Sequence, residues 1–208
     1  MENGINAERT NGSSELSKPS IVVPGEKSVT ISRFQLEHET KLLQEKLAAT
    51  SDFTQQTIAI ALPNSIELVS IFVAITRQRG IAALLNPGNK ENEFDFYLED
   101  VKSVMVIVPK GAYDANSDSV RAAKRHGSGI AECYWDGQTI ALDIIVKKER
   151  TNGQHMVAPN IEPLDTDIAL LLHTGGTTGR PKAVSLSFHY IGYLFDASLS
   201  GSINSQEP

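Results

Sequence analysis

The sequence is poor in several kinds of residue, and each shortage excludes a class of protein. Cys133 is the one cysteine among 208 residues, so no disulfide forms within the chain and a reducing compartment is expected. Lysine and arginine number 19 against 25 aspartates and glutamates. The resulting net charge of −6 argues against a nucleic-acid partner, because nucleic-acid-binding proteins present a basic face.

Long apolar runs are also missing. No stretch approaches the roughly eighteen consecutive apolar residues that a membrane-spanning helix needs, so the sequence predicts no membrane span. Residues 1–18 are polar and lack the apolar core of a signal peptide, and we interpret them as a disordered tail. Together these shortages lead us to expect a cytoplasmic protein.

What the chain does contain is enough apolar residues for a core, arranged in an alternating pattern. Hydrophobic residues make up 40% of the sequence, which is typical of a folded protein. Strand-like runs are predicted at residues 28–31, 57–62, 81–85, 104–108, 130–135, 167–172 and 182–187. Helical patterns fall between most of them, and a weaker one covers residues 189–199. This alternation predicts an α/β fold with a layered, mainly parallel sheet and helices on both faces.

Local signals mark where several of these elements begin and end. Ser32 with Gln35, and Asn64 with Glu67, have the spacing of a capping box at a helix start. The helix predicted at residues 66–79 is apolar on most faces, so we expect it to be sandwiched inside the protein. Residues 147–166 are charged and rich in turn-forming residues, and they are predicted to be a linker or exposed loop.

A glycine-rich stretch, HTGGTTGRPKAV at residues 173–184, follows the apolar run 168–172. It is not the P-loop of nucleotide hydrolases, which needs the pattern G-x-x-x-x-G-K-[ST]. Here Arg180-Pro181-Lys182 follows the last glycine, and Ala183 stands where a magnesium-binding hydroxyl is needed. The three glycines also lack the G-x-G-x-x-G spacing of dinucleotide-binding loops.

Two interpretations of this stretch remain open. Its backbone N–H groups, three threonine hydroxyls and two positive charges are groups that can hold a polyphosphate during its cleavage. Alternatively, it is a β-hairpin turn whose glycines relieve the strain of positive φ angles. Two adjacent threonines are unusual in a tight turn, which favours the phosphate-binding interpretation.

The motif also carries a family resemblance. T-G-G-T-T-G-R-P-K-A closely resembles T-[SG]-G-[ST]-T-G-x-P-K-[GA], the phosphate-loop signature of the adenylate-forming enzymes. That superfamily comprises acyl-CoA synthetases, firefly luciferases and the adenylation domains of peptide synthetases. His173 and the aliphatic strand before it look most like the oxalate–CoA ligase and peroxisomal CoA-synthetase-like branch. The segments IAIALPNSIELVSIFVAITRQRGIAALLNP, EFDFYLEDVKSVMVIVPKGA and AECYWDG are similar to that branch too, so the resemblance covers about residues 20–188.

The resemblance implies an AMP-forming carboxylate–CoA ligase. Such an enzyme uses ATP with Mg²⁺ to convert a small carboxylic acid into an acyl-adenylate, from which CoA then forms the thioester. The residues implied to bind the β- and γ-phosphates are Thr174, Gly175, Gly176, Thr177, Thr178, Gly179, Arg180, Pro181 and Lys182. Gly175 replaces the more usual serine, which removes a hydroxyl and adds about 0.5–1 kcal/mol of backbone entropy cost, so weaker phosphate binding is expected.

Other motifs of the family have no counterpart here. The segments that grip adenine and ribose and the lysine that promotes adenylation are absent, so no catalytic residue is assigned. We therefore expect an N-terminal fragment that is inactive alone, with a tail at residues 1–18, a partial AMP-binding domain at 19–188 and a divergent tail at 189–208. The alternative is a non-catalytic protein of the same fold that binds a nucleotide or a partner. Gln206-Glu207-Pro208 is not a peroxisomal tripeptide, which leaves peroxisomal targeting of a longer form open.

The remaining candidates for chemistry are histidines and the cysteine. The scattered histidines lack the spacing of metal ligands, so no metal site is predicted for His38, His126, His155 and His189. Cys133 has no basic neighbour in sequence and is predicted to be a small buried residue. His173 is either a structural histidine at a strand end or a substrate contact.

Overall fold

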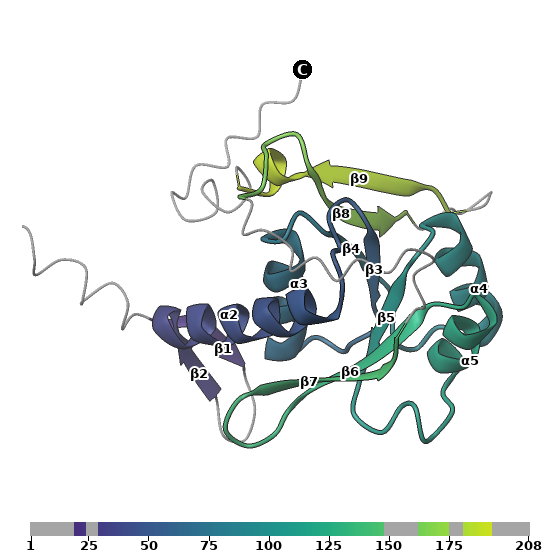
Figure 1. The fold of residues 1–208 in the computed structure, drawn as a ribbon, viewed down its shortest axis with the longest axis horizontal. Helices are drawn as coiled ribbons and strands as arrows, with labels where there is room; N and C mark the ends of the chain where they lie inside the picture. Colours follow the sequence, from purple (N-terminus) through teal and green to yellow (C-terminus); the bar gives the residue numbers. More distant parts are fainter. Residues whose placement is uncertain (1–18, 24–28, 148–161, 175–180, 193–208) are drawn as a thin grey trace, which may run out of the picture.

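The computed structural model describes residues 19–23, 29–147, 162–174 and 181–192 (Figure 1). Their strands form a two-stranded and a seven-stranded sheet. The strands are β1 (Pro19–Val23), β2 (Val29–Ser32), β3 (Thr57–Ile60), β4 (Ile81–Leu84), β5 (Met105–Val108), β6 (Gly129–Trp135), β7 (Ile140–Val146), β8 (Ile168–His173) and β9 (Ala183–Ser187). The helices are α2 (Arg33–Thr50), α3 (Ile66–Thr76), α4 (Glu91–Asp100) and α5 (Asp118–Arg125). None of these helices is both long enough and apolar enough to cross a membrane.

The large sheet is mainly parallel, as the sequence predicts. Its strand order is β7-β6-β5-β3-β4-β8-β9. β3 runs parallel to β4 and β5, while β6 and β8 extend the parallel array on its two sides. The outermost strands, β7 and β9, are antiparallel to their neighbours. The small sheet pairs β1 with β2 next to the start of α2.

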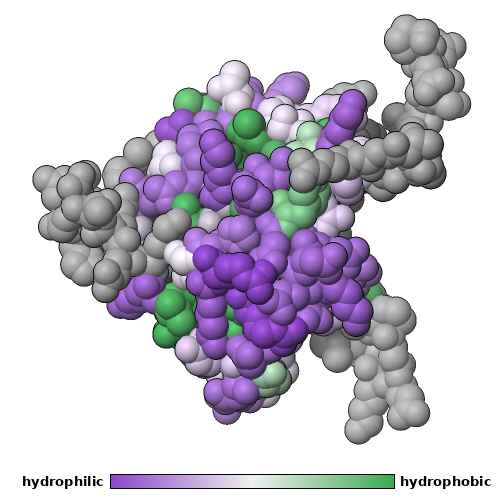
Figure 2. Space-filling model, turned by 90° about the vertical axis from the view of Figure 1, so that its right-hand side faces the viewer, coloured by the Kyte–Doolittle hydropathy of each residue, from purple (hydrophilic) through white to green (hydrophobic). Residues whose placement is uncertain are grey.

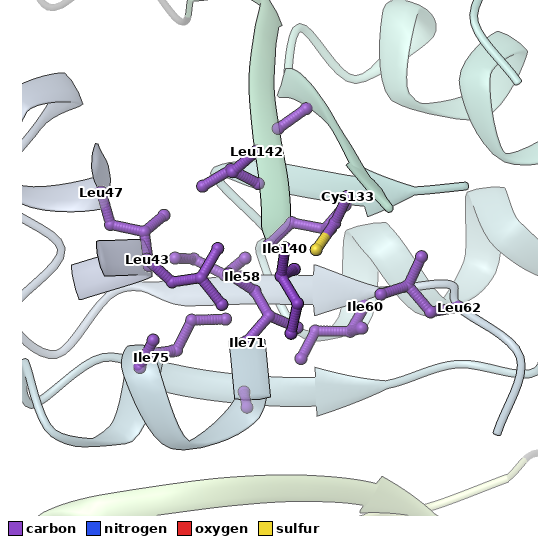
Figure 3. Close-up of a cluster of buried hydrophobic side chains, with 14 of the residues drawn as sticks. Leu43, Leu47, Ile58, Ile60, Leu62, Ile71, Ile75, Cys133, Ile140 and Leu142 are labelled. Atoms are coloured by element: carbon purple, nitrogen blue, oxygen red, sulfur yellow. The ribbon is translucent and has the colours of Figure 1, made fainter. Parts of the chain in front are cut away.

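Helices cover both faces of this sheet, which confirms the predicted layering. Successive residues of a strand point to opposite faces, so Ile58 and Ile60 pack with α2 and α3, and Ala59 packs with α4 and α5. Figure 3 shows the first cluster, where Leu43 of α2 and Ile71 of α3 approach β3. Helix α3 packs against α2 and against strands of the sheet, and most of its residues are buried or half-buried, as expected.

The predicted cap at Ser32 is confirmed, whereas the one at Asn64 is wrong by one residue. The Gln35 amide donates to Ser32 Oγ at 3.2 Å, and the Ser32 amide donates to Gln35 Oε1 at 3.0 Å. Helix α3 instead begins after Ser65, whose Oγ accepts from the Leu68 amide at 3.3 Å. With the cap at Ser65, the third helical residue is Leu68, so Glu67 does not complete a box, and its Oε1 instead accepts a hydrogen bond from the Trp135 amide at 3.0 Å.

Helix α3 ends before the predicted residue 79, at Thr76. Arg79 adopts a positive φ of 60°, which reverses the chain into β4. A side chain on the next residue, Gly80, would place its Cβ 2.9 Å from Ile75 Cγ2, so glycine is needed where the chain passes the helix. A glycine directly after the helical pattern at residues 120–126 predicts a left-handed helix end, and Gly127 indeed follows the cap residue His126 with a φ of 61°.

Strands β1 and β7 are the two described elements that the sequence pattern did not predict. β7 forms a hairpin with β6 across the turn at Asp136, which accepts hydrogen bonds from the amides of Gln138 and Thr139. Helix α2 holds this hairpin, because the buried Glu39 carboxylate accepts from Ile140 N at 2.8 Å and from Thr139 Oγ1 at 2.5 Å. An edge strand held by a residue about a hundred positions away leaves a weak local signal.

Several predicted segments lie outside the described residues. They are the tail at residues 1–18, most of the predicted loop (148–161) and residues 193–208 of the divergent C-terminal segment. Of the helix predicted at 189–199, the described part is a short helical turn over residues 188–192.

Candidate phosphate-binding loop

Residues 174–182 connect β8 to β9 at the carboxyl end of β8. Because β8 is parallel to β4, and β4 to β3, this connection lies at the edge of the sheet where the parallel strands end. In open α/β sheets, ligands bind at that edge. The glycine-rich stretch therefore lies where the fold places ligand sites.

A backbone hydrogen bond closes the mouth of this loop. The Thr174 amide donates to the Lys182 carbonyl at 3.0 Å, and Thr174 Oγ1 lies 3.5 Å from the same oxygen. His173 pairs with Ala183 in the preceding rung of the β8–β9 ladder. Of the nine predicted phosphate-binding residues, the structure describes Thr174, Pro181 and Lys182. The rest, Gly175, Gly176, Thr177, Thr178, Gly179 and Arg180, lie outside the described residues.

The two strands that flank the loop are antiparallel, so the connection is a hairpin. Ordinary β-hairpins need about two to five loop residues. This connection runs over residues 174–182, longer than strand reversal requires. The side chain of Lys182 is exposed, and within the described part of the chain no carboxylate forms an ion pair with it. A hairpin turn and a phosphate loop are therefore compatible descriptions of the same segment.

His173, the residue before the loop, is buried against helix α4. Its side chain is 6% exposed, and its Nε2 lies 3.0 Å from Asp100 Oδ2. The ring packs on Tyr97 with centroids 4.5 Å apart, and the Phe96 centroid lies at 6.2 Å. Of the two readings left open by the sequence, this geometry favours the structural histidine, because the ring faces α4 rather than solvent.

An ion pair that sequence reasoning missed anchors the other end of β8. Arg79 donates from Nε to Asp167 Oδ2 at 2.7 Å and from Nη2 to Oδ1 at 2.9 Å. The Leu164 amide adds a third bond to Oδ2 at 2.9 Å. These bonds, chiefly the one from Arg79, hold the pKa of the Asp167 carboxyl below its ordinary value. No local signal reveals the pair, because its members are 88 residues apart.

This ion pair predicts a pH dependence of stability. Asp167 has a lowered pKa in the folded chain, so its contribution is complete above the ordinary value of 3.8 and is lost as pH falls through the folded pKa. We expect Asp167→Asn to lower the free energy of unfolding at pH 7, with the difference from wild type shrinking below pH 3.8. Urea unfolding at pH 7 and below pH 3.8 measures the free energy of unfolding of the variant and of the wild type.

The control is Asp165→Asn. The Asp165 side chain is 80% exposed, so this substitution should change the free energy of unfolding little. Equal effects of the two variants at pH 7 would contradict the role of Arg79.

The face formed by α4 and α5 offers no comparable site. Arg121 Nε lies 2.5 Å from Glu91 Oε2, and Arg125 pairs with both Glu91 and Asp95. Hydrophilic side chains cover most of this side of the molecule (Figure 2). These cations are already paired with carboxylates, so they are poor candidates for binding a phosphate.

Cys133 is buried in the core cluster, as predicted. Burial raises the pKa of its thiol to about 12, so it is a neutral thiol at physiological pH and no nucleophile. Among the residues that the structure describes, no three His, Cys, Asp or Glu side chains are grouped so as to hold a metal ion.

The chain matches the AMP-binding enzyme family over residues 18–205 and belongs to that family. The predicted resemblance to the adenylate-forming enzymes is thereby confirmed.

Among curated relatives, the oxalate–CoA ligase of Saccharomyces cerevisiae is 33% identical over 150 residues, covering 64% of this chain and 28% of that protein. The probable CoA ligase CCL9 of Humulus lupulus is 34% identical over 178 residues, covering 80% of this chain and 31% of its own length. The chain thus spans about a third of the length of these relatives.

Solved structures show the same fold. The ATP-bound MatB of Rhodopseudomonas palustris superposes with a TM-score of 0.62 at 20% identity, over 84% of this chain and 33% of that protein. The o-succinylbenzoate CoA synthetase MenE of Bacillus subtilis, in complex with its acyl-adenylate intermediate, gives a TM-score of 0.59 at 26% identity, over 86% of this chain and 33% of MenE.

Proposed function

We propose that these 208 residues form the polyphosphate-binding part of an AMP-forming carboxylate–CoA ligase. The observation that carries the proposal is the loop at residues 174–182, which carries the family's motif at the carboxyl edge of the sheet and whose mouth Thr174 and Lys182 close. The relatives support it, since one is an oxalate–CoA ligase and solved neighbours hold ATP or an acyl-adenylate.

In the proposed reaction, the substrate carboxylate attacks the α-phosphate of ATP and pyrophosphate leaves. CoA thiolate then displaces AMP from the acyl-adenylate to form the thioester. The role of this chain is electrostatic, because backbone N–H groups, hydroxyls and Lys182 stabilise the charge that develops on the leaving pyrophosphate. Preorganised charges of this kind supply much of an enzyme's rate enhancement.

The described residues fit a polyanion better than a bare cation. Lys182 is exposed and has no carboxylate partner in the described part of the chain. No acidic cluster is described that would hold Mg²⁺ without a ligand. Mg²⁺ is commonly held through substrate phosphates, and when bound with ATP it neutralises phosphate charge. We therefore propose that the ion arrives with the nucleotide, and that the threonine hydroxyls of residues 174, 177 and 178 help to hold the complex.

Replacing Lys182 tests the proposal. In a chimera that joins residues 19–187 to the rest of the S. cerevisiae oxalate–CoA ligase, Lys182→Ala should slow adenylation about 10- to 150-fold. One hydrogen bond to a charged group is worth about 1.5–3 kcal/mol, which corresponds to that factor. The measurement is acid-dependent pyrophosphate release at varied ATP concentration.

The matched control is Lys147→Ala. Lys147 is also an exposed lysine, but it follows β7 at the opposite edge of the sheet from β9. It should leave the kinetics of the chimera unchanged. If Lys182→Ala behaves like Lys147→Ala, residues 174–182 are only a turn.

A further inference from the structure

His173 joins the candidate loop to helix α4. Its backbone forms the rung with Ala183, one residue before Thr174 bonds to Lys182. Its side chain points into the protein and reaches Asp100, the last residue of α4, with Nε2 3.0 Å from Oδ2. His173 therefore connects the mouth of the loop to a helix whose Phe94 and Leu98 are buried in the core.

The chemistry of this contact is more specific than packing needs. An ionised carboxylate only accepts hydrogen bonds, so Nε2 carries the proton and donates to Asp100. Nδ1 is buried without a hydrogen-bond partner among the described residues. Burying an unpaired polar atom is unfavourable, and a phenylalanine would fill the same space on Tyr97 without that penalty.

Asp100 is equally ill placed for the stability of its own helix. A carboxylate at a helix C-terminus faces the negative end of the helix dipole, which is unfavourable. The Asp100 side chain is 39% exposed, so the packing of the core does not require an aspartate at this position. What Asp100 does in this structure is accept the hydrogen bond from His173.

We infer that His173 and Asp100 are positioning residues of the phosphate loop, an inference that rests on the proposed function. By fixing the end of β8 to α4, they hold the closed mouth of the loop, and with it the exposed Lys182, in place for a phosphate group. Binding through preorganised groups weakens when their geometry loosens. Mutation of residues that orient metal ligands typically costs about 10- to 100-fold in affinity, and we expect an effect of the same order here. The hydrogen bond between His173 and Asp100, rather than the packing of the His173 ring, is what maintains the affinity for phosphate.

The test uses the 208-residue chain, labelled with ¹⁵N and titrated with magnesium pyrophosphate. The amide resonances of Thr174 and Lys182 report binding in each variant. His173→Phe keeps an aromatic ring on Tyr97 and removes the donor to Asp100, whereas His173→Gln keeps a donor near Nε2. We expect pyrophosphate affinity to fall about 10-fold in His173→Phe and in Asp100→Ala, and to remain within about 3-fold of wild type in His173→Gln.

Glu99→Ala is the control, because Glu99 is the exposed neighbouring acid for which no side-chain ion pair is described. It should bind like wild type. Should His173→Phe fail to fold, Asp100→Ala decides the question, since Asp100 lies at the surface. Wild-type affinity in Asp100→Ala, or an equal loss in His173→Gln and His173→Phe, would overturn the inference. If wild type and Lys182→Ala bind pyrophosphate equally or not at all, the proposed function of the loop is what fails.

Discussion

The 208-residue chain, assayed alone, should give no carboxylate-dependent exchange of labelled pyrophosphate into ATP. Exchange requires a carboxylate held at the α-phosphate, and the chain spans about a third of the length of its relatives. Fixing both reactants supplies about 7–11 kcal/mol of barrier reduction, which corresponds to a rate factor of roughly 10⁵ to 10⁸. Contacts from the loop alone should leave weak, unselective binding of ATP or pyrophosphate.

The assay would use oxalate, acetate, a medium-chain fatty acid and coumarate as test acids. The chimera with the S. cerevisiae ligase serves as the positive control, and the Lys182→Ala chain sets the background. Exchange by the wild-type chain above that background would show that a complete site lies within these residues. Binding of ATP without exchange would agree with either a part of a ligase or a non-catalytic binding protein, and recovery of activity in the chimera separates these two.

Phe94→Ala should cost about 3–5 kcal/mol of the free energy of unfolding. Phe94 is fully buried at the centre of the cluster between the sheet and helices α4 and α5, where it packs with Leu98 and Val120. Removing the ring leaves a cavity that the helices cannot fill without moving. Domains are stable by about 5–15 kcal/mol, so this loss is a large part of the total. In a chain of this length each kcal/mol shifts the melting temperature by about 2–4 °C, so it should fall by roughly 6–20 °C. Thermal unfolding followed by circular dichroism measures it.

Phe34→Ala is the matched control, since the same ring at the start of α2 is 62% exposed. It should change the free energy of unfolding by no more than about 0.5 kcal/mol. A comparable loss of stability in both variants would mean that the ring of Phe34 is covered in solution, or that Phe94 is not in a tight core. Because Asp100 lies on the same helix as Phe94, the stability of α4 also bears on the position of His173.

Local sequence was sufficient for the class of the fold and for the location of the loop. The alternation of short β-branched runs with helical patterns is a property of neighbouring residues, so it can be recognised without knowing the tertiary contacts. The Ser32 cap and the Gly127 helix end were predicted for the same reason, because each depends on residues within four positions. The phosphate-loop motif is also contiguous, and its match to a family needs no structure.

Tertiary contacts determine the features of the fold that local sequence did not predict. Ser65 rather than Asn64 caps α3, Glu67 accepts a hydrogen bond from the end of β6, and β7 is held in place by Glu39 of α2. Such pairs are separated by 68 to 101 residues, and no local pattern indicates them.

The site shows the same division. Thr174 and Lys182 belong to one motif, but the strand that leads to them, β8, contacts Arg79 at one end and Asp100 at the other. Those contacts exist because β8 inserts beside β4, next to strands that precede it by many residues. Strand order in a parallel sheet follows from how the connecting helices pack on its two faces, and packing of that kind is a property of the whole chain rather than of any segment.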